Sequence, residues 1–392
     1  MYFSNAIILY NSCMKIYDVI ILGSGASGLM CASHLEKSLD IAIVDSNEKV
    51  AKKLKISGGG KCNITNKYVD IKNFDGDSEL ITNALEKFSR DDLLDFLKEN
   101  NVDLELRKNR YYFCKHSADD IINVLKKKSS HATTLLNHEI ISLKKEVDIF
   151  ELKTSKVNIK AKKVIVATGG KSFKNLGASE IGLSIAKDFG LKVKEFFPAL
   201  VGLTTQPQEA WMKELSGLSC YVHIKVKDRT IKEEMLFAHK GISGPAILSA
   251  SLYWQKGNIS IDFLPNKNIL DLIKGSKKQV SSVIGLPKRL SKAILNAIDV
   301  EDVECKKLDA KSKEKLQKIH TYEFAPAGNF GFTKAEASRG GVVSSELNLN
   351  TLESNKVAGL YFIGEVVDVT GELGGYNFQW AFSSSVMCAE AL

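Results

Sequence analysis

The sequence lacks any long hydrophobic run: its 392 residues contain no stretch of about 18 consecutive apolar residues, which argues against a transmembrane helix. It also lacks a Cys-x-x-Cys pair and any cluster of histidine and cysteine with zinc-site spacing, so no metal site is expected. The seven cysteines are odd in number and widely spread, which is typical of free thiols in a reducing compartment. A signal peptide would require a basic residue before its apolar segment, and none precedes the short apolar run at residues 6–10. We therefore expect a cytoplasmic protein with a disordered extension over residues 1–13.

The composition is that of a soluble globular chain long enough for two or three domains, with 44% hydrophobic and 26% charged residues. A net charge of +8 arises from 54 Lys and Arg against 46 Asp and Glu, with both signs interspersed. The tightest cluster, residues 126–128, ends a helical pattern, where three lysines offset the negative helix terminus. A nucleic-acid-binding surface is therefore only weakly supported.

A dinucleotide-binding pattern lies near the start. Residues 19–22 form an apolar run typical of a buried parallel strand, and residues 23–28 read Gly-Ser-Gly-Ala-Ser-Gly, a complete G-x-G-x-x-G. A helical pattern over 29–37 and an apolar strand over 41–44 follow, and the strand ends at Asp45.

Each residue type in this pattern has a physical reason. Gly23 permits the tight turn, Gly25 lets backbone N–H groups approach a pyrophosphate, and Gly28 allows close packing of helix on strand. Ala26 and Ser27 lie in the glycine turn that leads into the helix, whose N-terminal donors favour a diphosphate. Asp45 follows Gly23 by 22 positions, the spacing expected of the acid that binds the ribose hydroxyls.

Three further glycine-rich segments favour FAD over NAD. No second G-x-G-x-x-G occurs, so a separate nicotinamide domain is not evident. Instead, "ISGGGKCNITN" follows the second strand, an apolar strand ends in "ATGG" at residues 167–170, and "GLYFIGE" precedes "GGYNFQW" near the C-terminus. The consecutive glycines predict a bare backbone surface against a ligand.

These segments, together with "FAHKGISGPAIL" and "FTKAEASRGGV", resemble the BaiN-type, aminoacetone-oxidase-like family of bacterial NAD(P)/FAD-dependent oxidoreductases over residues 14–392. The resemblance implies FAD and an α/β fold: a Rossmann-like FAD-binding domain of the two-dinucleotide-binding-domain flavoprotein type, with an inserted β-domain and a small helical domain. The predicted boundaries are 14–195 and 333–392 for the FAD-binding domain, 196–265 and 318–332 for the β-domain, and 266–317 for the helical domain. The sequence departs from the family at two places. Residues 177–182 stand where the family usually has a turn of the type T-G-D-G after "ATGG", and Lys61 stands where arginine is usual.

The resemblance and the motifs together assign candidate FAD-binding residues. They are Gly23, Gly25, Ala26, Ser27, Gly28, Asp45, Lys53, Gly59, Gly60, Cys62, Asn63, Ile140, Ala167, Thr168, Gly169, Gly364, Glu365, Gly375, Tyr376, Asn377 and Phe378. The last helix is expected to begin near Gly375 and to direct its N-terminal donors at the flavin. For Glu365 a helix-cap role is an equal alternative, and for Phe378 the interpretation as core packing is favoured.

Three residues are candidates for the chemistry itself. His239 lies in a turn rich in glycine and proline and exchanges protons near neutral pH, although a hydrogen bond within its own loop is the simpler interpretation. Arg339, before two glycines, suits an anionic substrate, the diphosphate or a structural ion pair. Tyr376 lies at the start of the last helix, where core packing is the alternative.

The leading hypothesis is an FAD-dependent oxidoreductase of a small molecule, with NADH or NADPH as a transient electron donor. The alternatives are an FAD-dependent RNA-modifying enzyme, suggested by the net charge, and a non-catalytic flavin-binding protein. Because acids are interspersed with the lysines, a nucleic-acid partner is the less favoured expectation. The sequence leaves the substrate and the oligomeric state open.

Overall fold

Five parallel strands form the centre of a seven-stranded sheet in this computed structural model, which describes residues 15–392. Their order is β7 (Thr133–Leu135), β2 (Ile41–Val44), β1 (Ile16–Leu22), β10 (Asn158–Val166) and β20 (Leu360–Phe362). Strand β20 pairs with the end of β10, and β9 (Ile149–Thr154) pairs with its beginning; β9 and β8 (Ile140–Glu146) extend the sheet as an antiparallel meander. The predicted Rossmann-like α/β fold is confirmed. The extension predicted over residues 1–13 lies outside the described residues.

Helices cover this sheet and place the chain's last segment beside its first. Helix α1 (Ala26–His34) packs against α13 (Tyr376–Ala389) and α5 (Asp119–Lys128), and α13 also packs on α3 (Ser78–Lys87) and α4 (Arg90–Glu99). Almost every side chain of α13 is buried, which is the pattern of a core helix. A capping box begins α4, since the Ser89 hydroxyl and the Asp92 carboxylate each accept a hydrogen bond from the other residue's backbone N–H.

Smaller elements complete this part of the molecule. The remaining helices are α2 (Lys52–Gly60) and α6 (Ile181–Asp188), and the small sheets comprise β3 (Asn63–Asn66), β6 (Tyr111–Cys114) and β5 (Leu104–Arg107), and β4 (Phe74–Asp75) with β21 (Thr370–Gly371). Within α2, Gly58 and Gly59 leave helical geometry with positive φ, so the triple-glycine segment forms a bend at the end of the helix.

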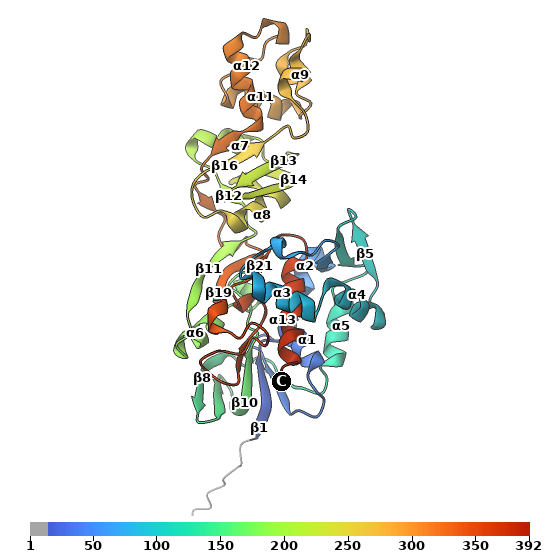
Figure 1. Cartoon of the computed structure of the whole chain (residues 1–392), viewed down its shortest axis with the longest axis vertical. Helices are drawn as coiled ribbons and strands as arrows, with labels where there is room; N and C mark the ends of the chain where they lie inside the picture. Colours follow the sequence, from blue (N-terminus) through green and yellow to red (C-terminus); the bar gives the residue numbers. More distant parts are fainter. Residues whose placement is uncertain (1–14) are drawn as a thin grey trace, which may run out of the picture.

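A second, antiparallel sheet occupies the middle of the elongated molecule (Figure 1). Its order is β17 (Tyr322–Phe324), β16 (Ile259–Asp262), β13 (Ser219–Val226), β14 (Arg229–Ala238), β15 (Gly241–Ser243), β12 (Leu203–Thr204) and β18 (Gly328–Asn329). Helices α7 (Trp211–Glu214) and α8 (Pro245–Tyr253) pack against it. It connects to the Rossmann part through the ribbon of β11 (Val193–Ala199) and β19 (Ala337–Val342).

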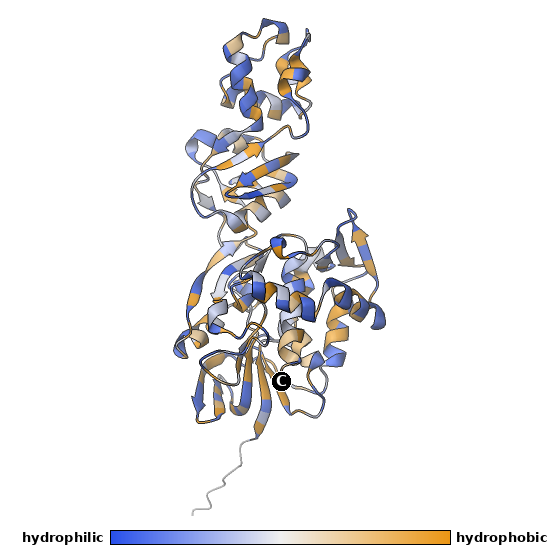
Figure 2. Ribbon diagram, viewed as in Figure 1, coloured by the Kyte–Doolittle hydropathy of each residue, from blue (hydrophilic) through white to orange (hydrophobic). Residues whose placement is uncertain are grey.

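The far end of the molecule is helical. It contains α9 (Ile269–Ile273), α10 (Val280–Val283), α11 (Lys288–Ala297) and α12 (Ala310–Leu316). Helix α12 is largely hydrophilic, whereas hydrophobic residues concentrate in the central strands of the parallel sheet (Figure 2). None of the helices formed by residues 15–392 has the length and apolar character needed to cross a bilayer.

Buried hydrophobic residues form two separate cores. The first is built from residues 17–196 and 342–389, and the second from residues 199–337. The helical segment shares the second core with the antiparallel sheet. The domain boundaries expected from the sequence remain a prediction, and the one at residues 195 and 196 falls inside strand β11.

Polar contacts join the two cores across their boundary. The Glu233 carboxylate of β14 accepts from the Arg110 guanidinium at 2.9 Å and from the Tyr111 hydroxyl at 2.8 Å. The Arg229 guanidinium donates to the Lys72 carbonyl at 2.8 Å, and the Tyr253 hydroxyl donates to Glu372 at 2.9 Å. These contacts attach β14 and α8 of the inserted sheet to the Rossmann part.

Glu233→Ala is expected to loosen this boundary, because it leaves Arg110 and Tyr111 without their shared acceptor. The loss of charge-assisted hydrogen bonds on this half-buried carboxylate is expected to cost on the order of 1 kcal/mol. Faster amide exchange in β5, β6 and β14, with a larger radius of gyration in solution scattering, is the expected measurement. Glu234→Ala is the matched control because its side chain makes none of these contacts; equal exchange in both variants would contradict the assignment.

Candidate flavin site

A cavity of about 750 Å³ lies where the glycine turns of the Rossmann part meet. It is lined by the β1–α1 turn, the ends of β2 and β10, helix α2, the segment after β20 and the start of α13. These elements come together because β1, β2, β10 and β20 are parallel, so their carboxyl ends lie at one edge of the sheet. The volume is within the range of small-molecule and cofactor sites, about 300–1,000 Å³.

Most residues assigned to the cofactor from the sequence line this one cavity. They are Gly23, Gly25, Ala26, Ser27, Asp45, Lys53, Gly59, Asn63, Ile140, Ala167, Thr168, Gly169, Glu365, Gly375, Asn377 and Phe378. The segment that departs from the family pattern, residues 177–182, also contributes to the lining through Gly177, Ala178, Ser179 and Ile181. The individual roles of these residues toward a cofactor remain proposals.

Gly25 and Gly28 do different work in the first turn. A Cβ at Gly28 would lie 1.9 Å from the Gly23 carbonyl oxygen, so only glycine lets α1 approach β1 this closely. At Gly25 a Cβ would meet no atom within 4 Å, and its backbone borders the cavity. Gly28 is therefore required for packing, whereas Gly25 leaves space for a ligand.

Asp45 holds the turn together from the end of β2. One carboxylate oxygen accepts from the backbone N–H and the hydroxyl of Ser24, both at 2.7 Å. The other accepts from the backbone and side-chain nitrogens of Asn47 at 2.8 and 3.0 Å. These four donors use most of the carboxylate's acceptor capacity, so Asp45 positions the glycine turn as well as bordering the cavity.

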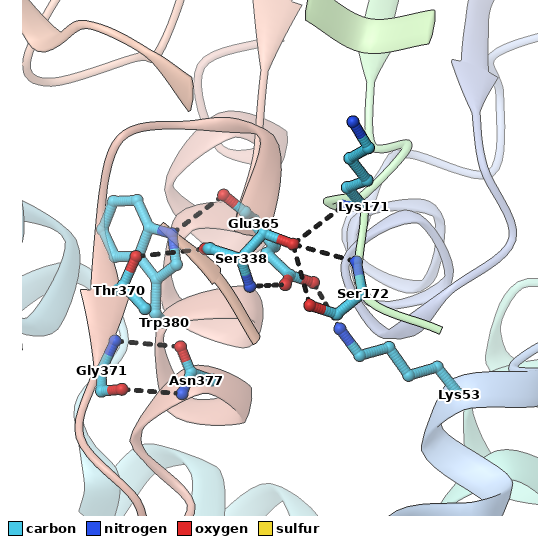
Figure 3. A network of polar contacts seen from close by, with 10 residues as sticks. Lys53, Lys171, Ser172, Ser338, Glu365, Thr370, Gly371, Asn377 and Trp380 are labelled. Atoms are coloured by element: carbon cyan, nitrogen blue, oxygen red, sulfur yellow. Dashed lines mark hydrogen bonds and ion pairs between the residues drawn. The ribbon is translucent and has the colours of Figure 1, made fainter. Parts of the chain in front are cut away.

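Glu365 links four segments that are distant in the sequence (Figure 3). Its carboxylate pairs with the Lys53 ammonium at 2.7 Å and accepts from the Ser338 backbone N–H at 2.8 Å. The Ser338 hydroxyl in turn accepts from the backbone N–H groups of Lys171 and Ser172 at 2.8 and 3.0 Å. Lys53 and Glu365 therefore form an ion pair at the cavity, and both residues line it.

The start of α13 borders the cavity through Gly375, Asn377 and Phe378, and its polar side chains make structural hydrogen bonds. The Asn377 amide brackets Gly371, accepting from its N–H and donating to its carbonyl, each at 2.9 Å. The Trp380 indole donates to the Gly364 carbonyl at 3.0 Å, and Gln379 is buried against Thr65 and Phe88. Phe378, for which core packing was the favoured interpretation, lines the cavity, whereas Trp380 is buried in the core.

None of the three residues considered for chemistry lines the cavity. His239 is exposed in the turn between β14 and β15. The Arg339 guanidinium pairs with Asp75 at 2.8 Å, which is the structural alternative. Tyr376 is buried, and its hydroxyl donates to the Tyr68 carbonyl at 3.1 Å on the other side of the helix start.

Four residues predicted to contact the cofactor also lie outside the lining: Gly28, Gly60, Cys62 and Gly364. Cys62 is fully buried, and burial raises the pKa of its thiol, as expected of an inert packing residue. Gly364 carries positive φ, and a Cβ there would lie 2.1 Å from the Ser27 hydroxyl oxygen, so it allows the close approach of β20's turn to α1.

Sequence reasoning missed two groups of lining residues. Arg107, Lys108, Tyr111 and Phe113 come from the β5–β6 hairpin, which carries no glycine motif. Leu200, Pro245 and Glu336 come from the boundary with the inserted sheet. Two of these had a signal, since Pro245 stands inside the quoted segment "FAHKGISGPAIL" and Glu336 inside "FTKAEASRGGV".

A second cavity of about 670 Å³ lies beside the first, on the other side of Tyr376. We call it the lysine–tyrosine groove. Its lining includes the cations Lys67, Lys72, Arg90 and Arg110, the acids Asp70 and Asp91, and the aromatic residues Tyr68 and Tyr376. Tyr68 is 57% exposed, and the Lys67 ammonium lies 5.6 Å from its ring centroid.

The first cavity fits FAD. The Thr168 hydroxyl is buried beside it with no hydrogen-bond partner within residues 15–392, which leaves it available to a ligand. The backbone at Gly25 and the N-terminus of α1 suit a pyrophosphate. The fold and this cavity define an FAD-binding flavoprotein oxidoreductase.

The chain belongs to the family described as "HI0933-like protein Rossmann domain", whose model matches residues 17–391, so the predicted family of FAD-dependent oxidoreductases is confirmed. It is 34% identical to the ribosomal RNA dihydrouridine synthase of Escherichia coli (strain K12), over 97% of this chain and 98% of that protein. It is 36% identical to the Haemophilus influenzae protein of the same description, over 94% and 97% of the two chains. The 3-dehydro-bile acid delta(4,6)-reductase of Clostridium scindens is 26% identical over 95% and 98%.

Among solved structures, a flavocytochrome c3 fumarate reductase in its open conformation matches with a TM-score of 0.50 and 13% identity. The match covers 96% of this chain and 78% of that one. At this identity the likeness concerns the fold alone.

Two glycine variants separate packing from ligand contact. Gly28→Ala is expected to destabilise the protein by about 1–3 kcal/mol, because backbone must move to admit the methyl group. Gly25→Ala is expected to leave the stability of the FAD-free protein unchanged and to weaken FAD binding about tenfold, or about 1.4 kcal/mol. Thermal unfolding and FAD titration measure the two effects. Equal loss of stability in both variants would contradict this division of roles.

Proposed function

We propose that the protein reduces a uridine base in ribosomal RNA to dihydrouridine, using FAD. The observation that carries the proposal is similarity over nearly the full length to two ribosomal RNA dihydrouridine synthases, at 34% and 36% identity. The bile acid reductase is similar over the same length at 26%. This ranking favours RNA modification over the small-molecule substrate that was the leading expectation from the sequence.

The lysine–tyrosine groove supports an RNA substrate. Its four cations exceed its two acids, and an exposed aromatic ring stands among them, the combination with which proteins bind single-stranded nucleic acid. The groove adjoins the flavin cavity, because Arg110 lines the one and its neighbour Tyr111 the other. Three of the four cations pair with carboxylates, Lys72 with Asp70, Arg90 with Asp91 and Arg110 with Glu233, and Lys67 is the cation of the groove, among the described residues, without such a pair.

The chemistry defines what the cavity must accomplish. Reduction of the uracil C5=C6 bond adds a hydride equivalent to C6 and a proton to C5, and bound FAD in its reduced form supplies the hydride equivalent. The uridine base must leave its stack to enter the cavity. Lys53, Glu365 and the glycine turns would hold the cofactor, and NADH or NADPH remains the proposed transient donor.

A small-molecule reductase is the second candidate, favoured by the bile acid reductase relative. Both activities reduce a carbon–carbon double bond conjugated to a carbonyl group. The substrate, rather than the reaction class, distinguishes them.

Production of this chain in an Escherichia coli strain lacking its own ribosomal RNA dihydrouridine synthase is expected to restore dihydrouridine in ribosomal RNA. Mass spectrometry of nuclease digests would detect the gain of two hydrogen atoms on one uridine. Purified holoprotein with NADH or NADPH should do the same on RNA from that strain. An unchanged digest in both experiments, from protein that carries FAD, would overturn the proposal.

Variants in the lysine–tyrosine groove are expected to weaken RNA binding without disturbing the flavin. Tyr68→Ala should cost about 1–3 kcal/mol of affinity for a single-stranded RNA oligonucleotide through lost base stacking. Lys67→Glu should weaken binding and lower the salt dependence by about one phosphate contact. Fluorescence anisotropy over a salt series measures both, and the flavin spectrum should stay unchanged.

Lys311→Glu, on exposed α12 at the far end of the molecule, is the matched charge-reversal control. If it weakens RNA binding as much as Lys67→Glu does, the groove has no special role.

A further inference from the structure

Glu336 stands where the flavin cavity meets the inserted sheet. It directly precedes β19, and its backbone N–H donates to the Leu200 carbonyl at 3.2 Å. Its side chain lines the cavity together with Leu200 and Pro245. Two elements that belong to the second core, the segment around Leu200 and helix α8, therefore border the same space as this carboxyl group.

The other carboxylates in the lining are already engaged. Asp45 accepts four hydrogen bonds, Glu365 binds Lys53 and Ser338, and Glu372 accepts from Tyr253 at 2.9 Å and Asn73 at 3.3 Å. Within residues 15–392, no donor bonds the Glu336 carboxylate and no cation forms an ion pair with it. It is thus the one lining carboxyl group of the described chain that is free to exchange a proton with a ligand.

The environment of Glu336 favours its neutral form. Glu336 is exposed toward the cavity, but surrounding protein atoms partly desolvate its carboxyl group and raise its pKa above the ordinary value. The charge of Lys53 opposes this only in part. Lys53 is itself paired with Glu365 at 2.7 Å, which directs its ammonium elsewhere. A carboxylic acid with a raised pKa is a suitable general acid near neutral pH.

Other candidate acids are less suited. Tyr111 lines the cavity, but its hydroxyl donates a hydrogen bond to Glu233, and burial raises the pKa of this hydroxyl further from neutrality. His239 and Cys62 lie outside the lining.

We propose that Glu336, as the carboxylic acid, donates the proton that C5 of the uracil ring gains during reduction. The proposal rests on the proposed function. The O–H bond of Glu336 breaks as a C5–H bond forms, while C6 gains a hydrogen with two electrons from the reduced cofactor, which is left oxidised. The Glu336 carboxylate then regains a proton from solvent. Uracil plus two electrons and two protons thus gives dihydrouracil.

The test uses pre-reduced holoprotein mixed anaerobically with unmodified ribosomal RNA, following flavin reoxidation. Glu336→Gln is expected to slow reoxidation by about 10²–10⁴-fold, the usual contribution of a general acid. Its reduction by the nicotinamide donor and its FAD content should stay unchanged. Glu323→Gln, the same change on exposed β17 outside the cavity, should react as the wild type does.

The pH dependence distinguishes a proton donor from a structural residue. Because the acid form is required, wild-type reoxidation should slow as pH rises through the raised pKa of Glu336. Glu336→Asp should keep this profile at a lower rate, whereas Glu336→Gln should lose it. Infrared titration of the protein, with and without FAD, should show a protonated carboxyl band that is absent from Glu336→Gln.

The outcomes separate the two proposals. If wild-type protein forms no dihydrouridine in RNA, the proposed function fails. If the wild type converts RNA but Glu336→Gln reoxidises at the same rate with the same pH profile, Glu336 is not the donor. Loss of FAD from Glu336→Gln and Glu336→Asp alike, or a carboxyl band unchanged by the substitution, would also overturn the role.

Discussion

The parallel pairing of β1, β10 and β20 is the constraint on which the site depends. Strands that begin at residues 16, 158 and 360 end at one edge of one sheet, so their turns must meet there. Close packing of α1 on β1 requires Gly28, and the approach of the β20 turn to α1 requires Gly364. Without this register the glycine turns would have no common space to surround.

The second dependence is the boundary between two hydrophobic cores. The first core carries the glycine turns, and the second brings Leu200 and Pro245 to the open side of the cavity. Arg110, Tyr111 and Glu233 hold the two together at one side of that boundary. Residues from both sides of this boundary therefore line the flavin cavity.

Within the family, relatives act on substrates as different as ribosomal RNA and a bile acid derivative. The parts that would bind FAD come from the Rossmann core, whereas the groove and the boundary residues are separate surfaces beside it. Under the proposed function, those surfaces would select the substrate class while the flavin cavity stays the same, because each reduction would need the same hydride source and one proton donor. This separation explains why the motifs around the cofactor site identify the family but not the substrate.

The sequence by itself determined the Rossmann-like fold and the glycine turns that line part of the cavity, because glycine turns after apolar strands are local patterns with a strict steric meaning. The cofactor class followed from the resemblance of the longer glycine-rich motifs to a known family. Tertiary structure decided the rest. It directed Tyr376 into the core and Arg339 to Asp75, left His239 exposed, and brought Glu336 and the β5–β6 hairpin to the cavity. Side-chain direction and pairing depend on contacts between distant segments, and no local spacing of residues encodes which carboxylate finds a partner and which is left free.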